Sequence, residues 1–103
     1  MPTPYSQLMR PAEPCYLVEW YSPKFLGATL ALAAETLDAT ATSLSTDKSP
    51  IRVSAVIAVP DDEVAFGIFV AGSADIVTRT CEQAGIPAQR VSAAADVEFL
   101  SPA

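Results

Sequence analysis

Histidine is absent from this sequence and cysteine is scarce. Without imidazole, Ser-His-Asp catalysis, histidine-ligated zinc and other histidine-dependent chemistries are excluded. The two cysteines, Cys15 and Cys81, are 66 positions apart, so the chain has neither a CxxC redox pair nor local metal-ligand spacing. We expect two free thiols that pack as small hydrophobic side chains. The four glycines have no phosphate-binding spacing.

Positive charge and long apolar runs are also lacking. Six basic residues against twelve acidic ones give a net charge of −6. A phosphate backbone or an anionic membrane repels such a chain on average, so we expect neither nucleic acid nor membrane as a partner. No run approaches the roughly 20 apolar residues of a membrane span, and the N-terminus lacks a basic region followed by an apolar run. The default expectation is a cytoplasmic protein.

Charged side chains of either sign make up only 17% of the 103 residues, whereas 50% of the residues are hydrophobic. This length fits one domain with its own core. This high hydrophobic and low charged fraction excludes a disordered chain and leaves little polar surface for a small monomer. We therefore expect another subunit to cover part of the surface, most simply in a homodimer.

Six regular elements can be located from hydrophobic periodicity and from the residues that begin or end helices and strands. Residues 1–14 hold four of the nine prolines and predict an extended arm, and residues 15–103 form the domain. Within the domain, the predicted elements are a strand at 15–21, a helix at about 26–45, a hairpin of strands at 51–59 and 64–71 around the turn 60–63, a helix between the Ser73 cap and Gly85, and a strand at about 89–100.

The order strand, helix, strand, strand, helix, strand predicts an α+β domain of the ferredoxin-like βαββαβ type. Right-handed crossovers and the central hairpin give a four-stranded antiparallel sheet of order 4-1-3-2, with both helices on one face. The strand at 64–71 is apolar on both of its faces, which is typical of a strand buried on two sides. Since the helices cover only one face, we expect something else to cover the other.

No residue set predicts a catalytic site, but five side chains are candidates for ligand binding. Glu19 lies midway along a central strand, where a carboxylate is costly to bury without a partner. It could serve as a general base or polar anchor with Tyr21 beside it, or simply pair with Arg52 or Arg90. Arg52 and Ser54 could bind a substrate carboxylate or point to water from an edge strand. The predicted set is Glu19, Tyr21, Arg52, Ser54 and Phe69.

Four segments together resemble a bacterial family. YLVEWY at 16–21, PDDE at 60–63, FGIFVA at 66–71 and AGIPAQRV at 84–91 are similar to a small ferredoxin-like family, a domain of unknown function that includes an actinobacterial nickel-binding protein. The resemblance implies a dimer whose sheets meet through their open faces. It also implies binding of a divalent metal such as nickel. This chain departs from the pattern, because Ala65 and Gly67 stand where such relatives carry cysteines, and Val70 stands where an acidic residue is usual.

Three functions follow as hypotheses. The first is a small homodimeric binding domain that is not an enzyme and needs no cofactor. The second is an enzyme of the dimeric α+β barrel kind, such as a cofactor-independent monooxygenase or isomerase, which would use Glu19 and Tyr21. The third is weak binding or sequestration of a divalent metal. No metal ligand is predicted, since the acidic turn at 61–63 offers too few ligands for a calcium site and is expected to be solvated.

Overall fold

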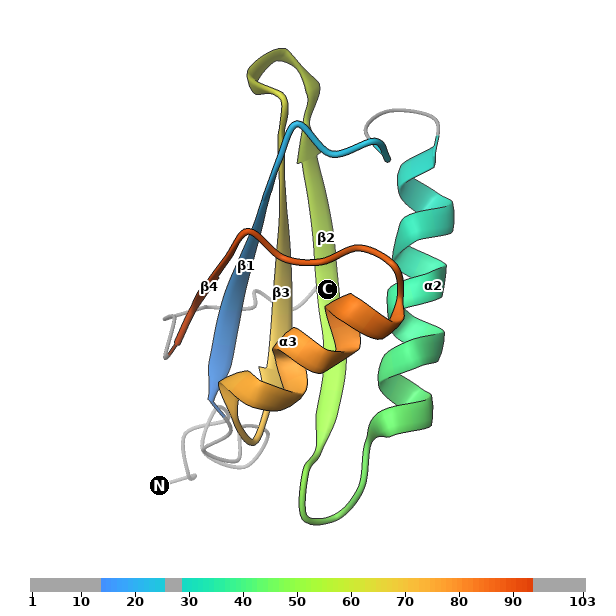
Figure 1. Ribbon diagram of the computed structural model, residues 1–103, viewed down its shortest axis with the longest axis vertical. Coiled ribbons are helices and arrows are strands. Elements are labelled where there is room, and N and C mark those ends of the chain that lie inside the picture. Colours follow the sequence, from blue (N-terminus) through green and yellow to red (C-terminus); the bar gives the residue numbers. More distant parts are fainter. Residues whose placement is uncertain (1–13, 26–28, 94–103) are drawn as a thin grey trace, which may run out of the picture.

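The computed structural model describes residues 14–25 and 29–93 (Figure 1). Most of the predicted arm, and the predicted strand beyond residue 93, lie outside the described residues. The elements in chain order are β1 (Cys15–Tyr21), α2 (Leu30–Leu44), β2 (Ile51–Val59), the 3-10 turn η2 (Pro60–Asp62), β3 (Val64–Ala71), α3 (Ala74–Gln83) and β4 (Arg90–Ser92). This is the predicted βαββαβ order. None of the helices in the described segments has the length and apolarity to span a membrane.

The four strands form one antiparallel sheet in the order β2-β3-β1-β4, which confirms the predicted order and the ferredoxin-like α+β class. β1 and β3 are central, in agreement with their being the most apolar and aromatic segments. One irregularity was not predicted: the pairing of β2 with β3 shifts between Val53 and Ala55. The extra residue, Ser54, forms a bulge and reverses the side-chain alternation along the rest of β2.

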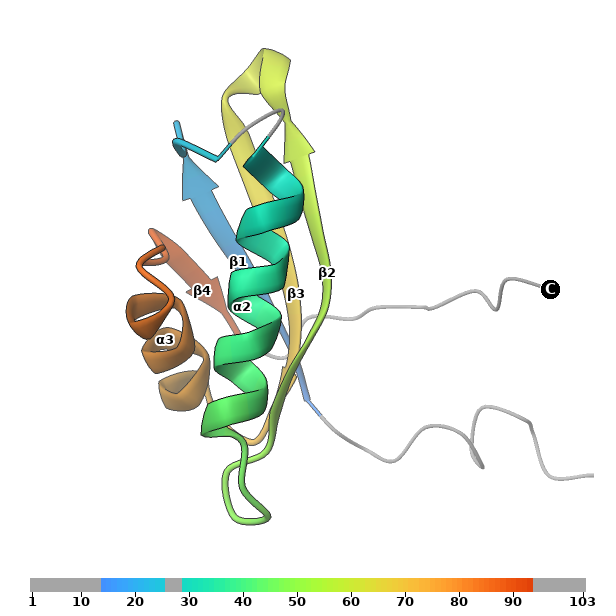
Figure 2. The same ribbon diagram turned by 90° about the vertical axis from the view of Figure 1, so that its right-hand side faces the viewer.

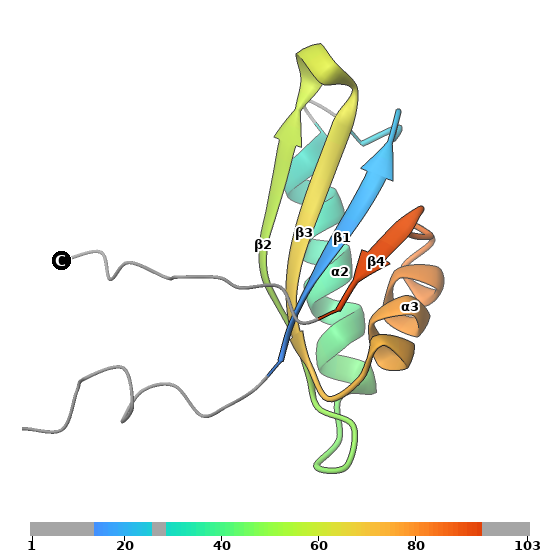
Figure 3. The same ribbon diagram turned by 90° about the vertical axis from the view of Figure 1, so that its left-hand side faces the viewer.

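Both helices pack on the same face of the sheet, which is seen from the helix side in Figure 2 and from the opposite side in Figure 3. On α2 the predicted apolar stripe is confirmed, because Ala33, Leu37 and Ala41 are buried against the strands. The described helix begins at Leu30, the predicted start at residue 26 lies outside the described residues, and Thr29 at the N-cap makes no side-chain capping bond. Packing therefore holds α2 in place.

Helix α3 has both of its predicted boundaries. The Ser73 hydroxyl accepts a hydrogen bond from the amide of Ile76 at 3.4 Å, which caps the first turn. After the last turn Gly85 adopts a φ of 80°, and the amide of Ile86 donates to the carbonyl of Cys81 at 2.9 Å. This is the left-handed ending in which glycine avoids the steric cost of a Cβ.

The core lies between the helices and the covered face of the sheet, and Trp20 is its largest side chain. The indole Nε1 donates to the carbonyl of Ile86 at 3.0 Å, and the indole packs edge to face on Phe25 with ring centroids 5.4 Å apart. Trp20 also explains Gly67, because a Cβ there would lie 2.9 Å from the indole and 2.8 Å from the Phe69 ring. The aromatic core thus requires glycine at the centre of β3.

Candidate functional site

The face of the sheet that lies away from the helices is apolar, and no helix of the described chain covers it (Figures 2 and 3). Strand pairing places alternate side chains of each strand on this open face. Its apolar members are Cys15, Leu17, Ala55, Ile57, Val59, Val64, Phe66, Ile68 and Val70. Most of them are half-buried, and Ile57 is 47% exposed. The open face is therefore a continuous apolar surface across three strands.

One polar cluster, made of Glu19, Tyr21 and Arg90, interrupts this surface at the β1–β4 edge. The Tyr21 hydroxyl donates to Glu19 Oε1 at 2.9 Å, and Arg90 Nε lies 3.7 Å from Glu19 Oε2. The strand register creates the cluster, because Glu19 and Arg90 are direct cross-strand partners. The Glu19 side chain is only 17% exposed, whereas that of Arg90 is 66% exposed. The pairing of Glu19 with Arg90, one of the two predicted alternatives, is present in the structure.

The chemistry of this cluster is that of a hydrogen-bonding anchor. The hydrogen bond to Glu19 raises the pKa of Tyr21 above its ordinary value of 10.0, and desolvation and the Glu19 charge act in the same direction. Arg90 opposes this shift. The Tyr21 phenol is therefore neutral near pH 7 and donates a hydrogen bond to Glu19. A polar group of a ligand can reach the exposed guanidinium of Arg90, which keeps further N–H donors.

Arg52 and Ser54 lie outside this cluster. Arg52 pairs with Val70 at one end of β3, whereas Glu19 pairs with Phe66, four residues along the same strand. This is a separation of roughly 13 Å along the sheet alone. Ser54 occupies the β2 bulge and is exposed at the sheet edge, so it does not share the face of Arg52 as strict alternation had predicted.

Phe69 is on the opposite side of the sheet from Glu19. Its ring is fully buried under the helices, where it pairs across the strands with Tyr16 and Val53. A ligand on the open face cannot reach it. Of the five predicted binding residues, the structure therefore brings together only Glu19 and Tyr21.

The described residues contain no group of three or more cysteine, aspartate or glutamate side chains placed to hold a metal ion. Ala65 and Gly67, the positions noted for cysteine in the family, are buried among the core aromatics. Cys81 is fully buried on α3, and desolvation raises the pKa of its thiol to about 12. It is a core residue and not a nucleophile.

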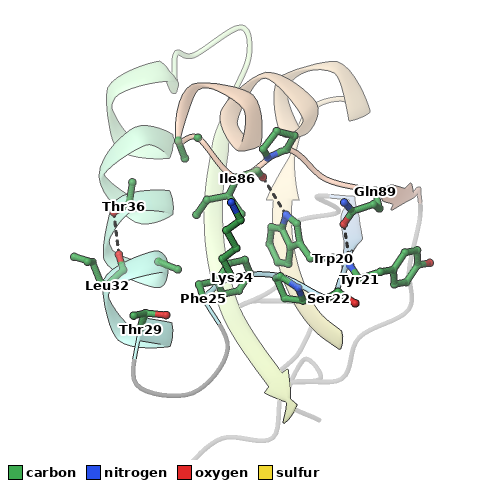
Figure 4. A pocket seen from close by; sticks show the side chains of 15 residues that line it. Trp20, Tyr21, Ser22, Lys24, Phe25, Thr29, Leu32, Thr36, Ile86 and Gln89 are labelled. Atoms are coloured by element: carbon green, nitrogen blue, oxygen red, sulfur yellow. Dashed lines mark hydrogen bonds between the residues drawn. The ribbon is translucent and has the colours of Figure 1, made fainter. Parts of the chain in front are cut away.

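Sequence reasoning missed a groove on the helix-covered side (Figure 4). Its volume is about 580 Å³, and it lies between the start of α2, the segment after β1 and the α3–β4 connection. Lys24, Phe25 and Leu32 line it together with Ile86. Two stretches far apart in sequence, residues 20–36 and 84–89, build this groove, so no local motif predicts it. The lone lysine in the segment SPKF at 22–25 is the sequence signal that could have pointed to it.

Comparison with known proteins supports the fold. No family model matches the chain, and no curated protein matches it at a significant level. A solved structure does match: SCO4226 from Streptomyces coelicolor A3(2) superimposes with a TM-score of 0.66 at 16% sequence identity. The match covers 84% of this chain and 99% of that protein. At this identity the two chains share the ferredoxin-like α+β fold, and the similarity shows the fold alone.

Proposed function

We propose that this chain is a homodimeric binding domain in which two copies meet through the open faces of their sheets. The observation that carries the proposal is the apolar surface of the open face, which continues across β1, β3 and β2. Contiguous exposed apolar surface of this kind is typical of protein interfaces and is costly to leave in water. A second copy offers the same surface, and a two-fold axis would pair it with itself.

Burial on association supplies the driving force. The side chains of Leu17, Phe66 and Ile68 are only half-buried by their own chain, and Ile57 is more exposed still. Each Å² of apolar surface that leaves water contributes about 25 cal/mol. The composition agrees with this reading, since the chain is 50% hydrophobic and 17% charged.

The Glu19 cluster would then lie at the margin of the dimer contact and provide its polar binding groups. Glu19 is held by Tyr21 and Arg90, so its charge is satisfied before any ligand arrives. Arg90 is the group with donors left for a ligand, and a carboxylate matches its two-pronged geometry. We therefore expect the ligand of this cluster to be a small acid.

An enzyme that uses Glu19 and Tyr21 is a weaker proposal. The raised pKa of Tyr21 keeps the phenol protonated near neutral pH, which is unsuitable for a general base. Both carboxylate oxygens of Glu19 already have partners within the chain, since Oε1 accepts from the Tyr21 hydroxyl and Oε2 faces Arg90, so neither is left for a substrate.

The test is the molar mass in solution of the full chain and two variants, measured by light scattering. The mass of one chain is 10.8 kDa, and we expect light scattering to give twice this molar mass for the unmodified protein. Ile57→Asp, on the open face, should return the mass to that of one chain, because a carboxylate would have to be buried in the contact. Ala39→Asp places the same charge on the exposed side of α2 and should leave the dimer intact. A monomeric unmodified protein, or equal dissociation by both variants, would contradict the proposal.

A further inference from the structure

We propose that the groove on the helix-covered side is a second binding site, which takes a small amphiphilic carboxylate with its apolar body in the groove and its acid on Lys24. The groove and the open face lie on opposite sides of the sheet, so this site does not depend on dimerisation. It also differs from the Glu19 cluster in chemistry, because its described lining contains no acidic residue and Lys24 is its one charged side chain.

The shape and lining of the groove suit an apolar ligand body. Its volume of about 580 Å³ falls within the range of small-molecule sites. Phe25 and Ala33 are buried at its base, and Leu32 is 64% exposed at its wall. Ile86 closes the side formed by the α3–β4 connection (Figure 4). A large exposed leucine beside buried aromatic and aliphatic groups provides surface that an apolar ligand can cover.

The polar groups of the lining are largely occupied by one another. The Trp20 indole donates to the carbonyl of Ile86, and the Thr36 hydroxyl donates to the carbonyl of Leu32 at 2.9 Å. The side-chain oxygen of Gln89 accepts from the backbone of Tyr21 at 2.8 Å. Recognition of a ligand by many neutral hydrogen bonds is therefore not available here. The ligand must be held by apolar contact and by charge.

Lys24 supplies that charge. Its side chain points into the groove (Figure 4) and makes no hydrogen bond or ion pair with the described part of the chain. None of the described lining residues is acidic, although the whole chain carries twelve acidic residues and a net charge of −6. Charge complementarity in this groove therefore favours an anion, against the charge of the molecule as a whole.

The start of α2 reinforces this preference. Thr29 lines the groove, and its side chain does not cap the helix. The first turn of α2 contains no acidic residue, so the positive end of the helix dipole is not balanced by the chain itself. An acid held by Lys24 would be stabilised by the same field.

The test uses octanoate, below its micelle concentration, as the probe and octanol as its neutral counterpart. Trp20 is the only tryptophan, so its fluorescence reports on the groove. We expect octanoate to bind the unmodified chain more tightly than octanol does. Lys24→Met should weaken octanoate binding about tenfold, the change expected for loss of one partly desolvated ion pair, and should leave octanol binding within twofold.

Two further variants make the result specific. Lys48→Met removes the other lysine, which lies in the exposed turn after α2, and should leave octanoate binding unchanged. Leu32→Asp places an acid on the groove wall and should weaken octanoate more than octanol. Equal affinities for octanoate and octanol, equal losses for the two lysine variants, or no binding of either probe would overturn the proposal.

Discussion

The two faces of the sheet are built from the same strands but meet different surroundings. Along β3, Phe69 is fully buried beneath the helices, whereas Phe66 points to the open face and is half-buried. Along β1, Trp20 is 1% exposed and Tyr21 is 47% exposed. Both faces are mainly apolar, yet residues 14–25 and 29–93 cover only one of them. The apolar character of β3 on both faces therefore exceeds what the described helices cover, and in the proposed dimer a second copy supplies the remaining cover.

The largest expected effect comes from shortening Phe69. Phe69→Ala would leave a cavity in the fully packed core, and we expect the free energy of unfolding to fall by about 3–5 kcal/mol. Urea denaturation measures this loss.

The matched variant on the other face is Phe66→Ala, on the same strand. It should cost less stability in dilute solution, and the loss should grow with protein concentration, because a dimer contact adds to stability by mass action. If the two variants lost the same free energy of unfolding at every protein concentration, the proposed difference between the covered and the open face would be contradicted.

The two thiols provide a second comparison between a covered and an open position. Cys81 is fully buried and its pKa is about 12, so about one thiol in 10,000 is ionised at pH 8. Cys15 is half-buried at the end of β1 on the open face. We expect a disulfide reagent to label Cys15 in the native chain at low protein concentration, more slowly as the concentration rises and a second copy covers the open face, and to label Cys81 only after unfolding. Cys15→Ser should abolish native labelling and Cys81→Ser should not; labelling of Cys81 in the native Cys15→Ser protein would contradict the assignment.

The smallest effect concerns Tyr21 at high pH. The folded protein holds the phenol proton more tightly than the unfolded chain does, because the hydrogen bond to Glu19 raises the pKa. The resulting contribution to stability is present below pH 10 and is lost as the pH rises through the folded pKa. Tyrosinate absorbance should show a late-titrating component that is lost in Tyr21→Phe. Glu19→Gln should move this titration back toward pH 10, and an unchanged titration would show that Glu19 is not its cause.

Sequence reasoning recovered most of the fold because the local signals were strong. The Ser73 cap and the Gly85 ending each depend on a few neighbouring residues, and both are found where they were predicted. The strand order followed from chirality and the central hairpin. The Ser54 bulge was missed, because a bulge depends on how two strands pair and alternation within one strand cannot reveal it.

The candidate site was less predictable. Glu19, Tyr21 and Arg90 were recognisable as possible partners, since β1 and β4 were expected to be neighbours. Phe69 was included in the predicted binding set, but its side chain lies under the helices and not on the open face. Lys24 could not be predicted as a binding residue, because the groove around it forms only when α2 and the α3–β4 connection come together. Sites formed by distant segments require the tertiary structure.

The central claim is that a second copy covers the open face, and intermolecular contacts between methyl groups test it most directly. A mixture of isotope-labelled and unlabelled chains reports only contacts between copies in a filtered NOE experiment. The account predicts contacts from the methyl groups of Leu17, Ile57 and Ile68, all on the open face. An absence of contacts from these three, or contacts only from Leu32 on the helix side, would contradict it.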